Sequence, residues 1–136
     1  MAIKQLDKRD LARAFEFYKE YVGGRSFAVF KHWYGKYPGL FAVCYRGDKL
    51  IGFCWGFPRK RLVILSGISI DAKHAGKGLG SRLLKDWEKR IKKQFGKTRI
   101  SLGSASGYVE RFYLKNGYKP VSVHVKLKPR QFKDCA

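Results

Sequence analysis

The sequence predicts a single α/β domain spanning residues 1–136, with a mixed, mostly antiparallel sheet flanked by helices. The first observation behind this prediction is a set of short apolar runs, of which residues 62–70 are rich in β-branched side chains, as buried strands are. The second is the recurrence of apolar residues every three or four positions between these runs, which is the period of an amphipathic helix. The third is a length that leaves no room for a second domain.

The first third of the chain is predicted to hold two helices. Asp7 is expected to cap the first helix, and Gly23-Gly24 to end it. Its apolar face comprises Leu11, Ala14, Phe15, Tyr18 and Val22. Residues 27–36 favour a second short helix before the turn at Pro38-Gly39. The aromatic side chains from 27 to 37 line either a substrate groove or the core, and the helical spacing favours the core.

A hairpin and a central strand follow. Strands at 40–45 and 50–57 are joined by residues 46–49, whose Arg-Gly-Asp string we interpret as turn chemistry rather than as an adhesion signal. Pro58 is expected to end the hairpin arm. Residues 62–70 then form the central strand, and Gly67 marks a predicted bulge.

The second half alternates helices and strands, so that the whole order reads βααβββαβαβ. The helix after residue 78 carries an apolar stripe of Leu79, Leu83, Leu84, Trp87 and Ile91. A strand at 98–102 leads to a helix bearing Tyr113, which Asn116-Gly117 ends. The final strand alternates Val121, Val123, Val125 and Leu127 with polar residues.

The turn between the central strand and the long helix has glycines at alternate positions, Gly76, Gly78 and Gly80. Glycines leave backbone N–H groups uncovered, and the start of a helix favours an anion, so the turn predicts a phosphate site. The string of a P-loop is absent, and the glycine spacing differs from the dinucleotide fingerprint. Both of these nucleotide sites are therefore disfavoured.

This turn resembles the acetyl-CoA diphosphate loop of the GNAT superfamily of N-acetyltransferases. Gly78 and Gly80 match the two small positions of the family pattern, whereas Ala75 stands where Arg or Gln is usual. Residues 106–118 resemble a second family segment, with the Phe112-Tyr113 pair, Gly117 and Tyr118 at family spacing. Ser106 and Val109 depart from it, where Asn and Ala are usual.

The resemblance implies a fold with splayed central strands and acetyl-CoA as cofactor. It implies cofactor contacts at Ile68, Ser69, Ile70, Gly76, Lys77, Gly78, Leu79, Gly80 and Ser81, the first three through the main chain. It also implies that Tyr113 donates a proton to the departing thiolate, because its phenol is protonated at neutral pH. The competing interpretation of Tyr113 is a core aromatic residue. His74 or Lys77 is the candidate to replace the side chain missing at Ala75.

The general base is left open. The strand at 98–102 has no carboxylate where some members of the family place a glutamate. His74, His124, a water chain or an acceptor amine of low pKa are the alternatives. Cys44 and Cys54 lie in apolar strands and are interpreted as core residues, and with Cys135 they lack the spacing of a zinc site or disulfide framework. No metal is expected.

The charge is the most unusual bulk property, with thirty Lys and Arg against ten Asp and Glu and a formal net charge of +20. Basic clusters occur at Arg59-Lys60-Arg61, at Lys89-Arg90 with Lys92-Lys93, and at Lys126, Lys128 and Arg130. They indicate either contact with a polyanion or a solvated surface, and the two are equally favoured. No apolar run could cross a membrane and no secretory signal is visible, so a cytoplasmic, basic protein is expected.

These observations leave three classes of function. The first is an acetyltransferase acting on a primary amine of a protein or peptide. The second is the same chemistry on aminoacyl-tRNA or a ribosome component, with tRNA or ribosome contact through the basic surface. The third is a nucleic-acid-binding module with a vestigial CoA pocket.

Overall fold

The computed structural model describes residues 2–21, 23–103, 107–121 and 130–135. The strands are β1 (Ala2–Gln5), β2 (Phe41–Arg46), β3 (Lys49–Arg59), β4 (Leu62–Ile70), β5 (Thr98–Gly103), β6 (Lys119–Val121) and β7 (Arg130–Cys135). The α-helices are α1 (Leu11–Tyr21), α2 (Phe27–Lys36), α3 (Leu79–Phe95) and α4 (Gly107–Lys115), with 3-10 turns η1 (Lys8–Asp10), η2 (Pro38–Leu40) and η3 (Ala72–His74).

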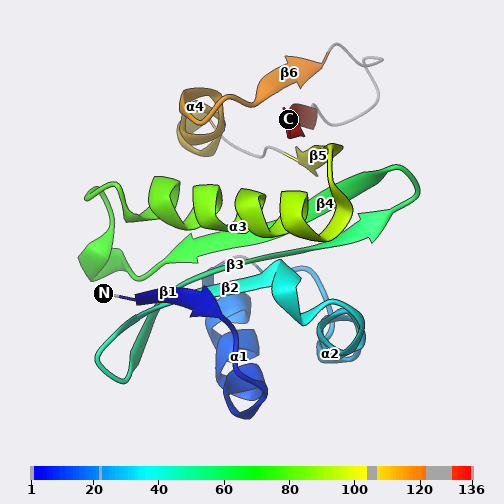
Figure 1. Cartoon of the computed structure of the whole chain (residues 1–136). Coiled ribbons are helices and arrows are strands. Elements are labelled where there is room, and N and C mark those ends of the chain that lie inside the picture. The colour runs from blue at the N-terminus through cyan, green and yellow to red at the C-terminus, as the bar shows by residue number, and fades with distance from the viewer. Residues whose placement is uncertain (1, 22, 104–106, 122–129, 136) are drawn as a thin grey trace.

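The described strands form one sheet in the order β1-β2-β3-β4-β5-β7-β6. Among the described pairs, β4–β5 alone is parallel, so the predicted mixed, mostly antiparallel sheet is confirmed. Figure 1 shows α3 along one face of the sheet, with α1 and α2 on the other. No helix in the described part of the chain is both long enough and apolar enough for a membrane span.

The N-terminal helices form as the capping and periodicity predict. The carboxylate of Asp7 accepts a hydrogen bond of 3.0 Å from the backbone N–H of Arg9, but it caps η1, which leads directly into α1. Ala14, Phe15 and Tyr18 are buried on α1, whereas Val22 lies outside the described residues.

The aromatic residues of α2 divide as the preference for the core suggests. Phe30 is fully buried, and Trp33 stacks on Phe57 with ring centroids 5.3 Å apart. Phe27 is exposed at its edge of the helix. The interpretation of these rings as a substrate groove has no support in this packing.

The expectation that Pro58 ends the hairpin arm is wrong. β3 continues through Pro58 to Arg59, where Pro58 is the register partner of Val63 on β4. On the other side of β3, pairing with β2 ends where Trp55 meets Phe41, so Pro58 lies beyond the first residue of β2. A proline without an N–H is tolerated at such an edge position.

The predicted bulge beside Gly67 is present on β4. Trp55 of β3 pairs with Gly67 and the next residue, Gly56, pairs with Leu65, so Ser66 is the extra residue. Gly56 is needed here, because a Cβ at this position would lie 2.1 Å from the carbonyl oxygen of Ile64.

The central strands β4 and β5 separate after a short junction. They pair over three residues of β4, Leu62 to Ile64, and in the described part of the chain no strand pairs with this edge of β4 from Leu65 to Ile70. The edge therefore presents backbone N–H and C=O groups without a strand partner, as the resemblance predicted.

The C-terminal part differs from the prediction. Most of the predicted alternating strand, residues 122–127, lies outside the described residues, as does His124. A strand that the sequence did not predict, β7, lies between β5 and β6 and is antiparallel to both. Cys44 and Cys54 are buried and free, which confirms their interpretation as core residues.

Candidate functional site

The glycine turn adopts the backbone that its sequence favours. Gly76 and Gly78 have φ of 79° and 77°, in the left-handed region that side-chain-bearing residues avoid. Gly78 is the N-cap of α3 and provides no side-chain hydrogen bond to it. The first N–H groups of α3 therefore lack the usual cap, which is the arrangement that binds an anion.

The position of this helix start is fixed by the burial of α3. The five residues of the predicted stripe, Leu79, Leu83, Leu84, Trp87 and Ile91, are all buried. Trp87 also donates a hydrogen bond of 2.9 Å from Nε1 to the carbonyl oxygen of Leu40. The turn before α3 is held as well, because the Asp71 carboxylate accepts a 2.8 Å hydrogen bond from the N–H of Lys73. That bond lowers the pKa of Asp71, which is a turn residue here.

A cavity of about 330 Å³ lies between this turn, the free edge of β4 and α4. Its lining residues are Ile68, Ser69, Ile70, Ala75, Gly76, Gly78, Gly80, Ser81, Phe112, Tyr113 and Lys115. The hydroxyl of Ser69 is buried and has no hydrogen-bond partner among the described residues. A buried polar group without a partner is costly, so a ligand that bonds to Ser69 would be favoured.

Tyr113 comes into this cavity from α4. It is 6% exposed, and within the described part of the chain no hydrogen bond to its hydroxyl occurs. Burial raises the pKa of Tyr113 well above its usual range, and the nearby thiol of Cys54 adds to the effect. The phenol thus keeps its proton at any pH near neutrality and acts as a hydrogen-bond donor.

Two contacts join α4 to the start of α3. The side-chain amide of Asn116 donates a hydrogen bond of 3.1 Å to the hydroxyl of Ser81. Phe112 lies against Gly80, where a Cβ would come within 3.2 Å of the ring. Gly80 therefore allows the helix carrying Tyr113 to approach the glycine turn closely.

Most of the residues predicted from the sequence meet in this cavity, but two do not line it. Lys77 is exposed, and Leu79 is 3% exposed and packs against Cys44 and Ile51. The sequence interpretation missed Phe112 and Lys115 as lining residues. The available signal was that Phe112 and Lys115 are three residues apart on the predicted helix, so that they share one of its faces beside Tyr113.

His74 does not replace the side chain missing at Ala75. It is 8% exposed, with Nε2 3.2 Å from Nη1 of Arg46 and Nδ1 3.6 Å from the carboxylate of Asp71. It lies outside the cavity lining, whereas Ala75 is part of it. No group of His, Cys, Asp and Glu in the described residues could hold a metal ion.

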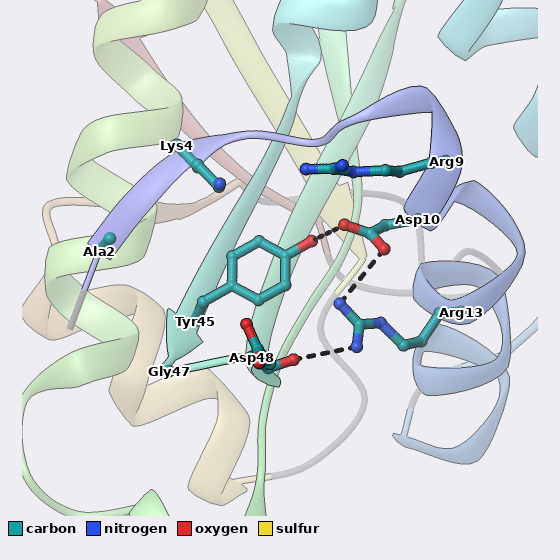
Figure 2. A pocket seen from close by; sticks show the side chains of 8 residues that line it. All are labelled: Ala2, Lys4, Arg9, Asp10, Arg13, Tyr45, Gly47 and Asp48. Carbon is teal, nitrogen blue, oxygen red and sulfur yellow. Dashed lines mark hydrogen bonds and ion pairs between the residues drawn. The ribbon is translucent and has the colours of Figure 1, made fainter.

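A larger hollow of about 620 Å³ lies elsewhere, where β1, α1 and the β2–β3 turn meet. Figure 2 shows its centre, where the Tyr45 hydroxyl donates a 2.6 Å hydrogen bond to Asp10 and Arg13 bridges Asp10 and Asp48. None of the residues predicted to be catalytic or to contact the cofactor lines this hollow. Because the Asp10 carboxylate is already engaged by two partners, we interpret this hollow as structural, despite its size.

The Tyr45–Asp10 pair predicts a loss of stability at high pH. Burial, followed by the hydrogen bond to Asp10, raises the pKa of Tyr45 from 10 to about 12. A raised folded-state pKa stabilises the fold fully below pH 10 and progressively less as the pH rises to 12. Tyr45→Phe should cost about 1–2 kcal/mol at neutral pH and flatten this decline.

The measurement is the free energy of unfolding of both proteins from neutral pH to pH 12. Tyr21→Phe, at a ring that is 40% exposed, is the control and should behave as the wild type does. Parallel declines in the wild type and Tyr45→Phe would show that Tyr45 does not ionise as described.

Comparison with known proteins gives the following findings. A family model described as "Acetyltransferase (GNAT) family" matches residues 4–118. No curated protein matches the sequence. The ribosomal-protein-S18-alanine N-acetyltransferase from Escherichia coli superposes with a TM-score of 0.76 at 15% identity, over 99% of this chain and 94% of that one.

Two further solved structures show the same fold. Ard1 from Thermoplasma volcanium has a TM-score of 0.78 at 15% identity, covering 99% of this chain and 97% of that one. An aminoglycoside 6'-N-acetyltransferase complexed with coenzyme A has a TM-score of 0.72 at 21% identity, covering 100% and 98%. At these identities the superpositions establish the fold alone.

Proposed function

The chain belongs to the GNAT acetyltransferase family, whose model covers residues 4–118 of 136, and from this premise we propose that it transfers an acetyl group from acetyl-CoA to an amine of a protein or peptide. The observation that carries the proposal is the single cavity shared by the glycine turn, the free β4 edge and Tyr113.

The residues of the cavity fit coenzyme A. Cβ atoms placed at Gly76 and Gly78 would meet nothing within 4 Å, so this turn leaves room for a diphosphate beside its N–H groups. The unpaired edge of β4 from Ile68 to Ile70 suits the amides of a pantetheine chain. Bound acetyl-CoA supplies the thioester, whose acetyl group is activated for attack by an amine.

Tyr113 is proposed as the catalytic hydrogen-bond donor. Its hydroxyl holds a proton at Oη, has no structural partner among the described residues and lines the cavity. Such a donor stabilises negative charge that develops on a departing sulfur. Ile68, Ser69, Ile70, Gly76, Gly78, Gly80 and Ser81 are proposed to contact the cofactor, with Lys77 and Leu79 contributing backbone groups only.

The general base is proposed to be dispensable for an α-amine. None of the described residues lining the cavity is a carboxylate or a histidine, and Lys115 brings positive charge. Positive surroundings lower the pKa of a nearby amine. At pH 7 about one α-amine in ten is already uncharged, compared with roughly one lysine amine in a few thousand. An N-terminal α-amine therefore suits this site better than a lysine side chain.

The net charge also bears on the acceptor class. A chain with a formal charge of +20 repels polycationic acceptors such as aminoglycosides and attracts acidic peptides. The neighbours by fold include an aminoglycoside 6'-N-acetyltransferase and the NatC complex bound to Gag peptide and CoA, that is, one structure with a small-amine acceptor in its name and one with a bound peptide. The charge disfavours an aminoglycoside and favours an acidic peptide as the acceptor of this protein.

A second candidate function is acetylation of aminoacyl-tRNA or of a ribosome component, for which the excess of twenty positive charges is the specific observation. The α-amine of an aminoacyl group has the low pKa that the site requires. The screen below separates this acceptor from peptides.

The test is thiol release from acetyl-CoA with three acceptor pools, namely peptides with free α-amines, small amines including aminoglycosides, and charged tRNA. We expect release to require a peptide, and acidic residues after the N-terminus to raise kcat/KM. Release with charged tRNA alone would transfer the proposal to the second candidate. Absence of release with all pools, together with absence of acetyl-CoA binding, would leave a nucleic-acid-binding module with a vestigial pocket.

Gly78→Val tests the turn separately from the acceptor. The substitution places a branched side chain where the diphosphate is proposed to lie, so we expect acetyl-CoA affinity to fall at least about 100-fold. Gly47→Val is the matched control, since Gly47 also has positive φ (61°), has nothing within 4 Å of its Cβ position and lies in the β2–β3 turn. Both variants should lose similar stability, measured by thermal melting, and calorimetry should show lost affinity for Gly78→Val alone. Equal affinities in both variants would refute the diphosphate site.

A further inference from the structure

The outward face of α3 is entirely basic. Between residues 82 and 93, every residue of α3 that is exposed is Lys or Arg. These residues are Arg82, Lys85, Lys89, Lys92 and Lys93, which we call the α3 basic face. Their spacing of three and four places them within roughly a third of the helix circumference, opposite the buried stripe.

The acidic residues of α3 are kept away from this face. Asp86 and Glu88 are half-buried at its flanks, where Asp86 pairs with Arg90 at 2.7 Å and Glu88 accepts a 2.8 Å hydrogen bond from Tyr118. The α3 basic face itself forms no ion pair in the described part of the chain. Arg90, which the sequence grouped with this cluster, is therefore excluded from it.

The composition of the face distinguishes between classes of partner. A protein interface has an apolar or aromatic centre and few lysines, whereas the surfaces that bind nucleic acid are polar and strongly positive. The large exposed apolar residues of the described chain, Tyr21, Phe27, Val29 and Leu114, lie on other helices. An amphipathic helix that inserts into a membrane surface buries an apolar face in lipid, and the apolar face of α3 is packed on the sheet.

The absence of aromatic side chains from the α3 basic face distinguishes between single-stranded and double-helical nucleic acid as its partner. Proteins that bind single strands stack bases on exposed aromatic rings, and the α3 basic face has none. A row of cations along one straight helix matches a phosphate backbone of fixed shape. We propose that the α3 basic face docks the phosphate backbone of double-helical nucleic acid, outside the cavity described above.

In the free protein, the lysines of the α3 basic face repel one another, and a bound phosphate backbone would remove that repulsion. Lys85, Lys89 and Lys93 are successive neighbours at four-residue spacing, and like charges at this spacing repel. Bound phosphates neutralise that repulsion and release counterions, so duplex binding should raise the melting temperature of the protein.

The test compares two triple variants of equal charge change by fluorescence anisotropy against short duplexes of RNA and of DNA. For the wild type, five phosphate contacts predict a slope of about −4.5 for log K against log salt between about 50 and 200 mM. For Lys85→Gln/Lys89→Gln/Lys92→Gln we expect a slope shallower by about 2–3 and a loss of affinity of at least about tenfold at 150 mM. The control, Lys8→Gln/Lys31→Gln/Lys36→Gln on η1 and α2, should stay within about threefold of the wild type.

Two further readouts keep the test independent of folding and of the acetyltransferase proposal. The α3 variant should melt at the same or a higher temperature than the wild type and retain acetyl-CoA binding, because its like-charge neighbours are gone and the glycine turn is intact. Comparison of the affinities for the RNA and DNA duplexes shows which of the two nucleic acids the α3 basic face binds more tightly. Equal losses in both triple variants, tighter binding of single strands, or tighter binding of polyglutamate or anionic vesicles than of duplex would each overturn the proposal.

Discussion

Tyr113→Phe is expected to lower the turnover number about 100-fold, with acetyl-CoA affinity and stability close to wild type. The hydroxyl has no hydrogen-bond partner among the described residues, so its removal breaks no structural contact there. A role confined to the core would leave turnover unchanged, since Phe fills almost the same volume. The measurement is kcat at saturating acetyl-CoA and acceptor, together with the dissociation constant of acetyl-CoA.

The control for this substitution is Tyr34→Phe. Its hydroxyl donates a 2.7 Å hydrogen bond to the carbonyl oxygen of Leu6, so this variant should lose about 1 kcal/mol of stability and no turnover. Because the pKa of Tyr113 is raised, the wild-type rate should also show no decline from its ionisation up to pH 10. Equal turnover numbers for Tyr113→Phe and the wild type would remove Tyr113 from the mechanism.

Gly56→Ala is expected to have the largest effect on stability, a loss of more than about 3 kcal/mol in the free energy of unfolding. A Cβ here would lie 2.1 Å from the carbonyl oxygen of Ile64 and 2.6 Å from Cζ2 of Trp87. The first of these atoms is backbone in the neighbouring strand and cannot rotate away, so the β3–β4 hairpin must shift next to its bulge. Chemical denaturation of both proteins measures the loss.

Gly52→Ala, on the same strand and four residues earlier, is the matched comparison. Its Cβ would approach the ends of two side chains, Ile70 Cδ1 at 2.9 Å and Leu83 Cδ2 at 3.2 Å, which can change rotamer. We expect a loss of about 1 kcal/mol there. Similar losses at the two positions would mean that the close approach at Gly56 is relieved without moving the hairpin.

Elements whose signal is local were predicted well from the sequence. The bounds of β4 and the five buried residues of α3 follow from β-branched content and helical period, and both agree with the structure. The end of α4 after Lys115 follows from Asn116-Gly117, with Gly117 at φ of 92°. The bulge beside Gly67 and the splay beyond it also agree with the prediction.

Elements that depend on distant partners were not predicted. β7, with the sequence Arg-Gln-Phe-Lys-Asp-Cys, lacks an apolar alternation and is a strand because β5 and β6 pair with its two edges. The continuation of β3 through Pro58 likewise depends on where β2 begins. The place of Lys115 in the cavity lining and the withdrawal of Arg90 toward Asp86 depend on packing between helices and on which side chains are nearest.

The junction of three residues between β4 and β5 has a mechanical consequence. Strands β1 to β4 form one continuous antiparallel part of the sheet. Strands β5, β7 and β6 are joined to it through the few backbone hydrogen bonds between β4 and β5. Among the described residues, β4 and β5 share three register pairs, whereas β3 and β4 share eight, so bending at residues 62–64 strains fewer ladder contacts than bending between β3 and β4. The two halves nevertheless share one core, in which Ile100 and Tyr113 pack in the same cluster as Trp87, so any change of their angle must be accommodated by side-chain repacking beside the junction.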